Sequence, residues 1–598
     1  MLMSEEARRE LKLGTGFWIL GLLSAAALLP VLIEHGGGKL SPGTLLSVRL
    51  TNFAFVAVFL AESILGLVRA PDRRHYLRTG AVELLLLLGL GLVFVLISFH
   101  PFGFFEVRGL QGFLIPAQVY LLGNFIVKLL GLFKVVARRR FNYARAFGAS
   151  FLAIIVAGTL LLYLLPGTQA PGKELTLIDA LFTSTSATCV TGLITVDTGT
   201  QFSRFGQTII LILFQVGGLG IMTFAAFFAI ALGKGMGIRD RDVMRGVLNL
   251  DVMGKIVKVV VGILLITVLF EAAGTAVLYH RWEGDLAPPD RLFHSVFHSV
   301  SAFCNAGFCL MSDSLEGLVH DPVVNATMMT LIVVGGLGFG VLLELLGLPI
   351  FGFRFLRRFS RREDEFSVVQ RPRLGLQGRI VLLSSLVLLL GGALLFYAFE
   401  RNNPATLGDL SGGEKAQAAL FASVTARTAG FNTVPVGEMT DASQFLTVAL
   451  MMIGASPGST GGGVKTVTVV VLLISVYSVL RGRKRVELFR RTIPPATVQR
   501  AGIIVVTSIA FVFVATLILV TVEADRFSFL SIFFEVGSAF GTVGLSTGIT
   551  PALSGLSKLT LCVIMLLGRI GPLSLVIALS QGGASSRYEY PEENVMIG

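Results

Sequence analysis

Long apolar runs separated by short polar segments fill most of this chain. The first four runs cover residues 13–33, 44–68, 80–99 and 112–136. A helix rises about 1.5 Å per residue, so about 20 apolar residues cross the hydrocarbon core of a bilayer. The first run is longer than the apolar part of a signal peptide, and the segment before it is as acidic as it is basic. We therefore expect four membrane-spanning helices at the N-terminus.

From about residue 146 the same order of segments occurs four times: an apolar helix, a short semi-polar segment and a second apolar helix. The pattern predicts an all-α integral membrane protein with about twelve spanning helices. The paired apolar runs are 147–165 with 206–233, 257–279 with 323–348, 380–399 with 444–480, and 501–522 with 556–580.

The four semi-polar segments share a motif. When they are aligned on one glycine, these glycines are 115, 123 and 114 residues apart, and a large apolar residue follows each of them. A phenylalanine lies ten residues before the glycine in three copies and nine before it in the third. Such self-similarity indicates a fourfold internal repeat. The copies are FTSTSATCVTGL (182–193), FHSVSAFCNAGF (297–308), FASVTARTAGF (421–431) and FEVGSAFGTVGLSTG (534–548).

Composition agrees with a membrane protein. The chain is 54% hydrophobic and only 14% charged, with a mean hydropathy of +0.79, which excludes an ordinary soluble domain. The net charge is +12, but the basic residues gather in short loops between apolar runs, so we expect no nucleic-acid partner. The four cysteines lack the spacing of a disulfide framework or a metal cluster.

The distribution of charge predicts the topology. Basic residues follow the second and fourth apolar runs and also occur in the linkers between the repeats, as at Arg357 and Arg358. The loops next to the motifs carry acidic residues instead, such as Asp290 and Glu316. By the positive-inside rule, the basic loops and both termini are cytoplasmic and the motifs lie near the outer face. We expect a multi-pass protein of the cytoplasmic (inner) cell membrane, with the lipid bilayer as its surroundings.

A segment of about 12 residues is too short to cross the membrane and return as helix, so each motif predicts a half-helix followed by extended backbone. Four such loops around an axis can point their carbonyl oxygens inward and replace the hydration shell of a monovalent cation. The alternative is that the glycines only pack helices together. The candidate filter residues, acting mainly through backbone, are Cys189, Val190, Thr191, Gly192, Cys304, Asn305, Ala306, Gly307, Arg427, Thr428, Ala429, Gly430, Gly541, Thr542, Val543 and Gly544.

These motifs, with GASPGSTGGGVKT (454–466), GRIGPLSL (568–575) and the tail YPEENVMIG, resemble those of the Trk/Ktr/HKT superfamily of potassium transporters, and most closely the Ktr membrane (pore) subunit. The resemblance covers about 146–598. It implies four helix–pore loop–helix repeats around one central pore that takes up K⁺, with no covalent chemistry and no organic cofactor. It also implies a homodimer that docks on a cytosolic nucleotide-binding regulatory ring.

The predicted units follow from the repeats and the resemblance. Four extra N-terminal helices precede the pore, and we interpret them as a packing or dimer-interface module rather than a voltage sensor. The units are 1–140 (N-terminal four-helix extension), 141–235 (pore repeat A), 236–350 (repeat B), 351–480 (repeat C), 481–580 (repeat D) and 581–598 (cytoplasmic C-terminal tail).

The apolar run 444–480 is too long for one spanning helix, since its 37 residues would measure about 55 Å against a core of about 30 Å. Its glycines and proline predict two helices joined by an intramembrane gate loop under the filter. GASPG also matches the nucleophile elbow of serine hydrolases, but no strand–helix alternation surrounds it. The candidate gate residues are Gly454, Ala455, Ser456, Pro457, Gly458, Ser459, Thr460, Gly461, Gly462, Gly463 and Arg569.

Arg569 stands alone as a basic residue in the middle of the last apolar run. Such an arginine faces a cavity or a partner. The resemblance implies that it lies in the pore below the filter; the alternative is a structural ion pair with Glu271 or Glu344. Three other functions stay open: a Na⁺-permeable or weakly selective cation pathway, an intramembrane serine hydrolase, and a structural membrane protein whose repeats only pack.

Overall fold

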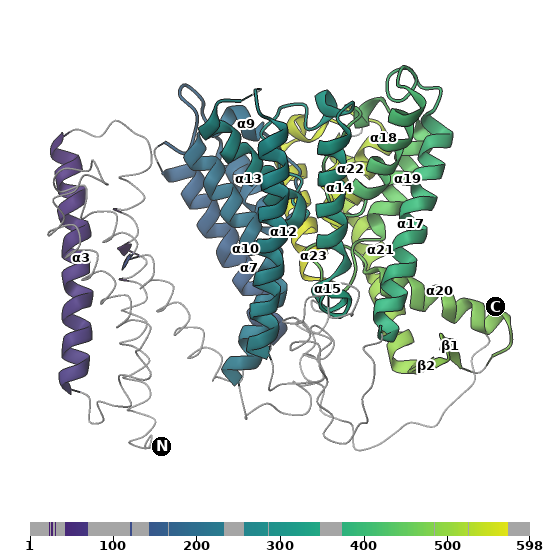
Figure 1. The fold of residues 1–598 in the computed structure, drawn as a ribbon, viewed down its shortest axis with the longest axis horizontal. Coiled ribbons are helices and arrows are strands. Elements are labelled where there is room, and N and C mark those ends of the chain that lie inside the picture. Colours follow the sequence, from purple (N-terminus) through teal and green to yellow (C-terminus); the bar gives the residue numbers. More distant parts are fainter. Residues whose placement is uncertain are drawn as a thin grey trace.

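The computed structural model describes residues 42–69, 143–232, 256–346 and 374–571, without the single residues 166, 285, 484 and 524, together with residues 23, 26, 27, 30, 120 and 121. The predicted N-terminal runs other than 44–68 and the tail 581–598 therefore fall largely or wholly outside the described residues. Run 44–68 is helix α3 (Pro42–Arg69), which lies at the edge of the molecule on the side of repeat A (Figure 1).

The described part of the chain is almost entirely helical, as expected. Each repeat has a first long helix, a short pore helix and a third helix that leads away from the motif. Repeat A consists of α7 (Tyr143–Leu164), α8 (Leu177–Cys189), α9 (Thr198–Gln201) and α10 (Arg204–Leu232), and repeat B of α12 (Ile256–Arg281), α13 (Pro288–Cys304), η3 (Glu316–Leu318), α14 (Pro322–Leu337) and α15 (Phe339–Leu346). Repeat C consists of α17 (Leu376–Glu400), α18 (Gly412–Thr425), η5 (Val436–Glu438), α19 (Asp441–Met452) and α20 (Thr466–Leu480), and repeat D of α21 (Pro495–Glu523), α22 (Phe529–Gly541), η6 (Thr550–Ala552) and α23 (Gly555–Ile570).

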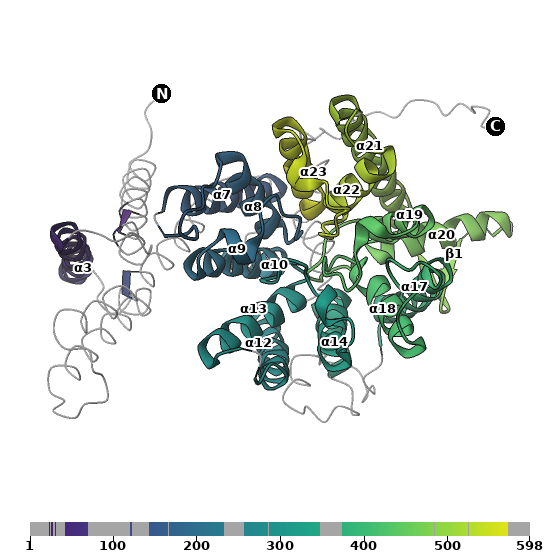
Figure 2. The same cartoon turned by 90° about the horizontal axis from the view of Figure 1, so that it is seen from above.

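The four repeats close into a ring. The third helix of each repeat packs against the pore helix of the next: α10 contacts α13, α14 contacts α18, and α19 contacts α22. Helix α23 of the last repeat then contacts α8 of the first. Viewed from above, the chain runs around the central axis in sequence order (Figure 2). The axis is therefore the one place where all four motifs can meet.

Burial follows the membrane pattern. The long helices expose large apolar side chains, such as Leu394 at 71% and Val506 at 69%, on their outer sides. Among the described residues, four helices are long and apolar enough to span a membrane, or five if one bent pair counts as a span. Polar residues concentrate inside instead, which is the reverse of a soluble protein and is typical of a chain that surrounds a polar pathway.

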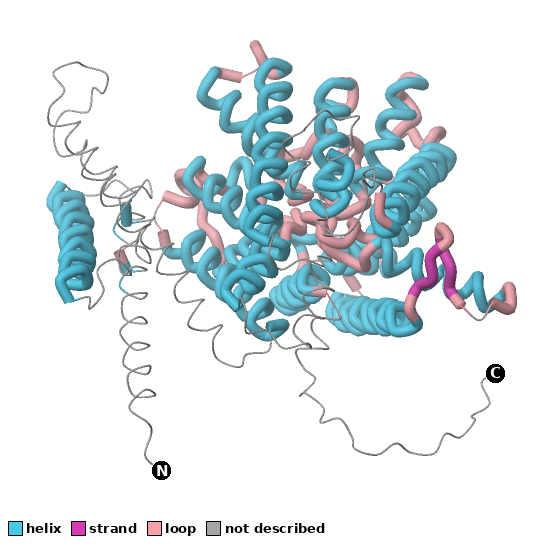
Figure 3. Tube along the Cα trace, turned by 60° about the horizontal axis from the view of Figure 1, so that its bottom comes forward, coloured by secondary structure: helices cyan, strands magenta, loops and turns pink. Residues whose placement is uncertain are grey.

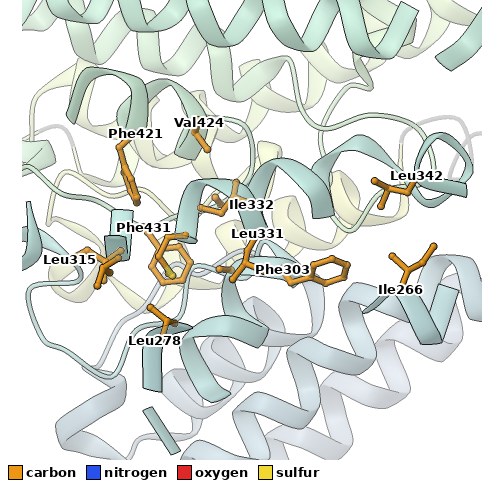
Figure 4. Close-up of a cluster of buried hydrophobic side chains, with 14 of the residues drawn as sticks. Ile266, Leu278, Phe303, Leu315, Leu331, Ile332, Leu342, Phe421, Val424 and Phe431 are labelled. Carbon is orange, nitrogen blue, oxygen red and sulfur yellow. The ribbon is translucent and has the colours of Figure 1, made fainter. Parts of the chain in front are cut away.

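Apolar clusters join neighbouring repeats. The largest links repeat B to repeat C: Phe303 of α13 and Leu331 and Ile332 of α14 pack with Phe421 of α18 and with Phe431, which follows the third motif glycine (Figure 4). All five side chains are at most 3% exposed. Close packing of this kind holds the pore helices at fixed positions around the axis.

Two features differ from the expected pattern. The single helix expected over 323–348 is bent by 103° between α14 and α15. The bend lies at Gly338, which has φ +90°, and the Phe339 amide donates to the Gly458 carbonyl at 2.9 Å. In addition, a two-stranded hairpin, β1 (Val486–Leu488) and β2 (Arg491–Ile493), joins repeats C and D, with Val486 paired to Ile493 (Figure 3).

Candidate functional site: a four-glycine ring and the loop beneath it

The pore helices end where the motifs begin. In repeats A, B and D the residue that ends the helix is left-handed: Val190 (φ 58°), Asn305 (φ 58°) and Thr542 (φ 50°). This conformation is costly for the β-branched residues Val190 and Thr542. The backbone N–H of each of the three residues donates to a carbonyl in the last turn of its own helix. In repeat C the helix ends earlier, at Thr425, and Thr428 takes the left-handed conformation (φ 73°). The shorter third copy is thus accommodated without moving its glycine.

The four motif glycines form a closed ring, here called the four-glycine ring. All have positive φ, between +71° and +97°, and a Cβ atom added to any of them would lie under 3.0 Å from a carbonyl oxygen of the next repeat. Only glycine combines this conformation with this approach. Each ring glycine faces one carbonyl oxygen of the next repeat, and that oxygen belongs to the residue just before the next ring glycine. The pairs are Gly192 with Ala306, Gly307 with Ala429, Gly430 with Val543, and Gly544 with Thr191.

The ring lies at the carboxyl ends of four buried pore helices. The carboxyl end of a helix carries partial negative charge, and the extended backbone beyond it supplies further carbonyl oxygens. All the candidate filter residues are buried except Gly544, which is partly exposed, and Arg427 is 8% exposed. A ring of carbonyl oxygens at converging negative helix ends can hold a cation that has lost its water.

Hydroxyl groups near the ends of the pore helices support the ring, and the sequence analysis did not identify them. The Gly192 amide donates to Ser186 Oγ at 3.0 Å, and the Gly544 amide donates to Ser538 Oγ at 3.1 Å. In the other two repeats the hydroxyl donates instead: Ser301 to the Phe308 carbonyl at 2.8 Å and Thr425 to the Phe431 carbonyl at 2.6 Å. The repeated Ser-Ala or Thr-Ala pair upstream of each glycine was the available signal.

The loop predicted to form a gate, residues 454–463, lies against the ring. It joins α19 to α20 and is mostly buried. A Cβ atom added to Gly461 would collide with the hydroxyl of Thr428, and one added to Gly462 with that of Thr542. The loop therefore contacts the motif segments of repeats C and D through positions that only glycine can fill.

Repeat B anchors the other side of this loop. The Ser456 amide donates to the Gly336 carbonyl at 3.1 Å, and the Thr460 hydroxyl donates to the Gly335 carbonyl at 3.2 Å. Gly335 lies in the last turn of α14, just before the bend at Gly338. The bend and the loop thus form one assembly beneath the ring.

Arg569 of α23 is 2% exposed and donates to backbone carbonyls on both sides of the axis. Its acceptors are Thr460 in the loop and Gly217 and Gly218 in α10. The alternative of a structural ion pair is wrong within the described residues. Glu271 accepts from the Gln215 amide at 2.9 Å, and Glu344 accepts from the backbone amide of Gly375 at 3.1 Å.

A second glycine recurs in the third helices, and sequence reasoning missed it. A Cβ atom added to Gly217, Gly335 or Gly568 would overlap the carbonyl oxygen of Thr188, Phe303 or Phe540, respectively. Each of these carbonyls lies four residues before a ring glycine, in the last turn of its pore helix. The string GGLG, which occurs at 217–220 and again at 335–338, was the available signal.

The sequence of this chain is similar to those of known cation transport proteins. Residues 116–588 match the family model described as TrkH, cation transport protein, so the match begins earlier than the expected residue 146. The chain is 39% identical over 465 residues to Ktr system potassium uptake protein B of Bacillus subtilis (strain 168), covering 78% of this chain and 99% of that protein. It is 36% identical over 466 residues to potassium/sodium uptake protein NtpJ of Enterococcus hirae, covering 77% of this chain and 98% of that protein.

The fold is also shared with a solved structure. The crystal structure of the potassium transporter TrkH from Vibrio parahaemolyticus matches with a TM-score of 0.56 at 18% identity, covering 84% of this chain and 97% of that chain. The resemblance read from the motifs, and the expectation of a transporter rather than an enzyme, are both confirmed by these relatives. The chain belongs to the TrkH family of cation transport proteins.

Proposed function

We propose that this protein takes up K⁺ across the cytoplasmic membrane and selects it at the four-glycine ring. One observation carries the proposal: each glycine faces a carbonyl oxygen of the next repeat, and the series returns from Gly544 to the strand of Gly192. A single chain thereby supplies a pseudo-fourfold selectivity filter. Two similar proteins are named for potassium uptake, which supports K⁺ as the transported ion.

Sodium is the second candidate ion. The Enterococcus hirae relative is named a potassium/sodium uptake protein and is 36% identical to this chain. A filter with one glycine per repeat offers fewer carbonyl rings than a filter of several consecutive sites, so its discrimination depends strongly on the exact width of that one ring. Na⁺ permeation through the same ring is therefore the alternative to test.

The loop 454–463 and Arg569 act as the gate in this proposal. An ion that leaves the ring meets the loop at Gly461 and Gly462 and then the guanidinium that holds the Thr460 carbonyl. Two unit charges about 4 Å apart interact by about 4 kcal/mol at an effective dielectric constant near 20, and the barrier that we assign to the arginine is of that order. Moving the loop aside would remove both obstacles.

We further propose a homodimer that docks on a cytosolic nucleotide-binding regulatory ring, with both termini in the cytoplasm. Helix α20 supports a protein interface, because Val479 and Leu480 are 72% and 80% exposed next to the basic hairpin β1–β2. Deleting residues 588–598, which include the apolar group Val595, Met596 and Ile597, should weaken assembly in detergent. A truncated protein that remains dimeric and still binds the cytosolic ring would exclude a role for the tail.

Uptake itself is the first experiment. The gene should allow a K⁺-uptake-deficient bacterium to grow on low-K⁺ medium, and purified protein in liposomes should take up rubidium. Competition by external Na⁺ then separates the two candidate ions, because a K⁺-selective ring leaves rubidium uptake nearly unchanged at a large excess of Na⁺. Folded protein that neither rescues growth nor moves rubidium would contradict the proposal.

A further inference from the structure

One buried carboxylate holds the segment that follows the ring in repeat D. Glu535 lies on pore helix α22, nine residues before Gly544, and is fully buried. It accepts hydrogen bonds from Ser546 Oγ at 2.7 Å, the Thr547 amide at 2.9 Å, Thr547 Oγ1 at 3.2 Å and Thr550 Oγ1 at 2.6 Å. Four donors from one short segment therefore converge on a single side chain.

The contacts fix the chain on both sides of the ring glycine. Before it, the Ser538 hydroxyl accepts from the Gly544 amide; after it, Glu535 holds residues 546–550. Residues 538 and 535 lie on the same pore helix, one turn apart. The filter strand of repeat D is thus tied at two points to a rigid element, and its carbonyl oxygens cannot move outward without breaking charge-assisted hydrogen bonds.

The same position is used in repeat B by a different group. His298 lies nine residues before Gly307 on α13 and is also fully buried. Its Nε2 contacts Cys309 Sγ at 3.1 Å and accepts from the Leu310 amide at 3.4 Å, so it too holds the segment after its glycine. Because the repeats follow one another around the axis, repeats B and D stand on opposite sides of it (Figure 2).

Repeats A and C have no matching support among the residues that the structure describes. The corresponding residue in repeat A is Thr183, whose buried hydroxyl has no hydrogen-bond partner in the described part of the chain. In repeat C an alanine, Ala422, lies eight residues before Gly430. The segment after the glycine is held from repeat B, where Glu316 accepts from the side-chain Nδ2 of Asn432 at 2.7 Å. The ring is therefore supported unequally.

We propose that Glu535 is a positioning residue that sets the width of the ring at Gly544 and thereby the preference for K⁺ over Na⁺. This inference rests on the proposed function of the ring as a filter. Glu535 acts through the backbone of residues 544–550 and does not itself contact the ion. A ring of fixed width discriminates between ions of different radius, and loosening one strand lets it contract around the smaller ion.

The test compares Glu535→Gln with a matched control in rubidium-uptake and Na⁺-competition assays on purified, reconstituted protein. The control is Glu400→Gln: Glu400 is also fully buried and accepts from Thr406 and Thr440, but it ties α17 to α19 away from the ring. We expect Glu535→Gln to lower the K⁺/Na⁺ preference roughly tenfold, because glutamine keeps only one acceptor oxygen and at least one buried hydroxyl loses its acceptor. We expect Glu400→Gln to leave the preference unchanged per folded protein.

Milder variants keep the test decisive if Glu535→Gln folds poorly. Thr550→Val removes one donor to Glu535 and Ser546→Ala removes another, and each should lower the preference by a smaller factor. Equal preference in wild type, Glu535→Gln and both milder variants would overturn the inference. Gly544→Ser measured in parallel separates the two proposals: if it alters selectivity while the Glu535 set does not, the filter stands and only the positioning role fails.

Discussion

The guanidinium of Arg569 donates a hydrogen bond to the backbone carbonyl of Thr460, joining the last helix of the pore to the loop beneath the ring. The same side chain reaches Gly217 of α10, so one buried cation connects repeats A, C and D. Because its acceptors are neutral carbonyls, its positive charge is not cancelled by a carboxylate within the described residues. In the gate that we propose, the charge that holds the loop is therefore the same charge that would repel a passing cation.

Replacing Arg569 with alanine should open the pathway. The change removes the charge and frees the Thr460 carbonyl, while no acid loses its partner in the described part of the chain. Rubidium uptake per folded protein should rise about tenfold, which corresponds to a barrier lower by about 1.4 kcal/mol. Unchanged uptake with a lower melting temperature would assign Arg569 a purely structural role.

Lys465 should restrain the same loop. Its Nζ donates to the Gly461 carbonyl at 2.6 Å and approaches that of Gly462 at 3.4 Å, next to the carbonyl that Arg569 holds. Lys465→Met keeps the apolar stem but loses the donor, so uptake should rise by a smaller factor than for Arg569→Ala. Lys465→Arg is the control that keeps the charge. Because the two cations hold adjacent carbonyls, the double variant should deviate from additivity, and strictly additive effects would argue against a shared restraint.

Two glycine-to-alanine substitutions should differ in their effect on the stability of the protein. Gly335→Ala places a Cβ atom against the Phe303 carbonyl, and such overpacking costs roughly 1–3 kcal/mol. Gly391 of α17 has nothing within 4 Å of an added Cβ, so Gly391→Ala should be neutral or stabilising by about 0.5–1 kcal/mol. Melting temperatures in detergent check both. Equal tolerance of alanine at the two sites would show that the contact with the pore helix is not tight.

Acid should weaken one contact between repeats B and C. Hydrogen bonds from Ser411, and then from His320, lower the pKa of Glu414 from 4.5 to about 2. A carboxyl with a lowered folded-state pKa stabilises the fold above its unfolded pKa, and this contribution is lost as the pH falls toward the folded value. The melting-temperature difference between wild type and Glu414→Gln should therefore narrow between about pH 6 and about pH 3. A difference that stays constant over this range would contradict the assignment.

The four-glycine ring was predictable because the sequence repeats the residues that form it. Four glycines in register, each followed by a large apolar residue, specify both the special backbone and its anchor, and Leu193, Phe308, Phe431 and Leu545 are all at most 3% exposed. The break in the run 444–480 was predictable from its length and its glycines. Local pattern and repetition carry this information, and both are visible in one sequence.

Contacts between distant segments were not predictable in the same way. The sequence suggested acidic partners for Arg569 because carboxylates can be recognised by residue type, whereas its acceptors are backbone carbonyls that every residue has. The bend at Gly338 was missed because the run 323–348 is apolar enough to be taken as one helix, and hydropathy does not show where the direction of a helix changes. The hydrogen bonds to Glu535 depend on how the chain returns after Gly544, which the motif does not encode.

The most direct test of the account is K⁺/Na⁺ competition for rubidium uptake in four single variants: Gly192→Ser, Gly307→Ser, Gly430→Ser and Gly544→Ser. Each adds a Cβ atom where it would lie under 3.0 Å from a carbonyl oxygen of the next repeat, on a residue with positive φ. If the ring selects the ion, all four variants, normalised to folded protein, should discriminate less between K⁺ and Na⁺. Wild-type discrimination in all four would contradict the claim that these glycines form the selectivity filter.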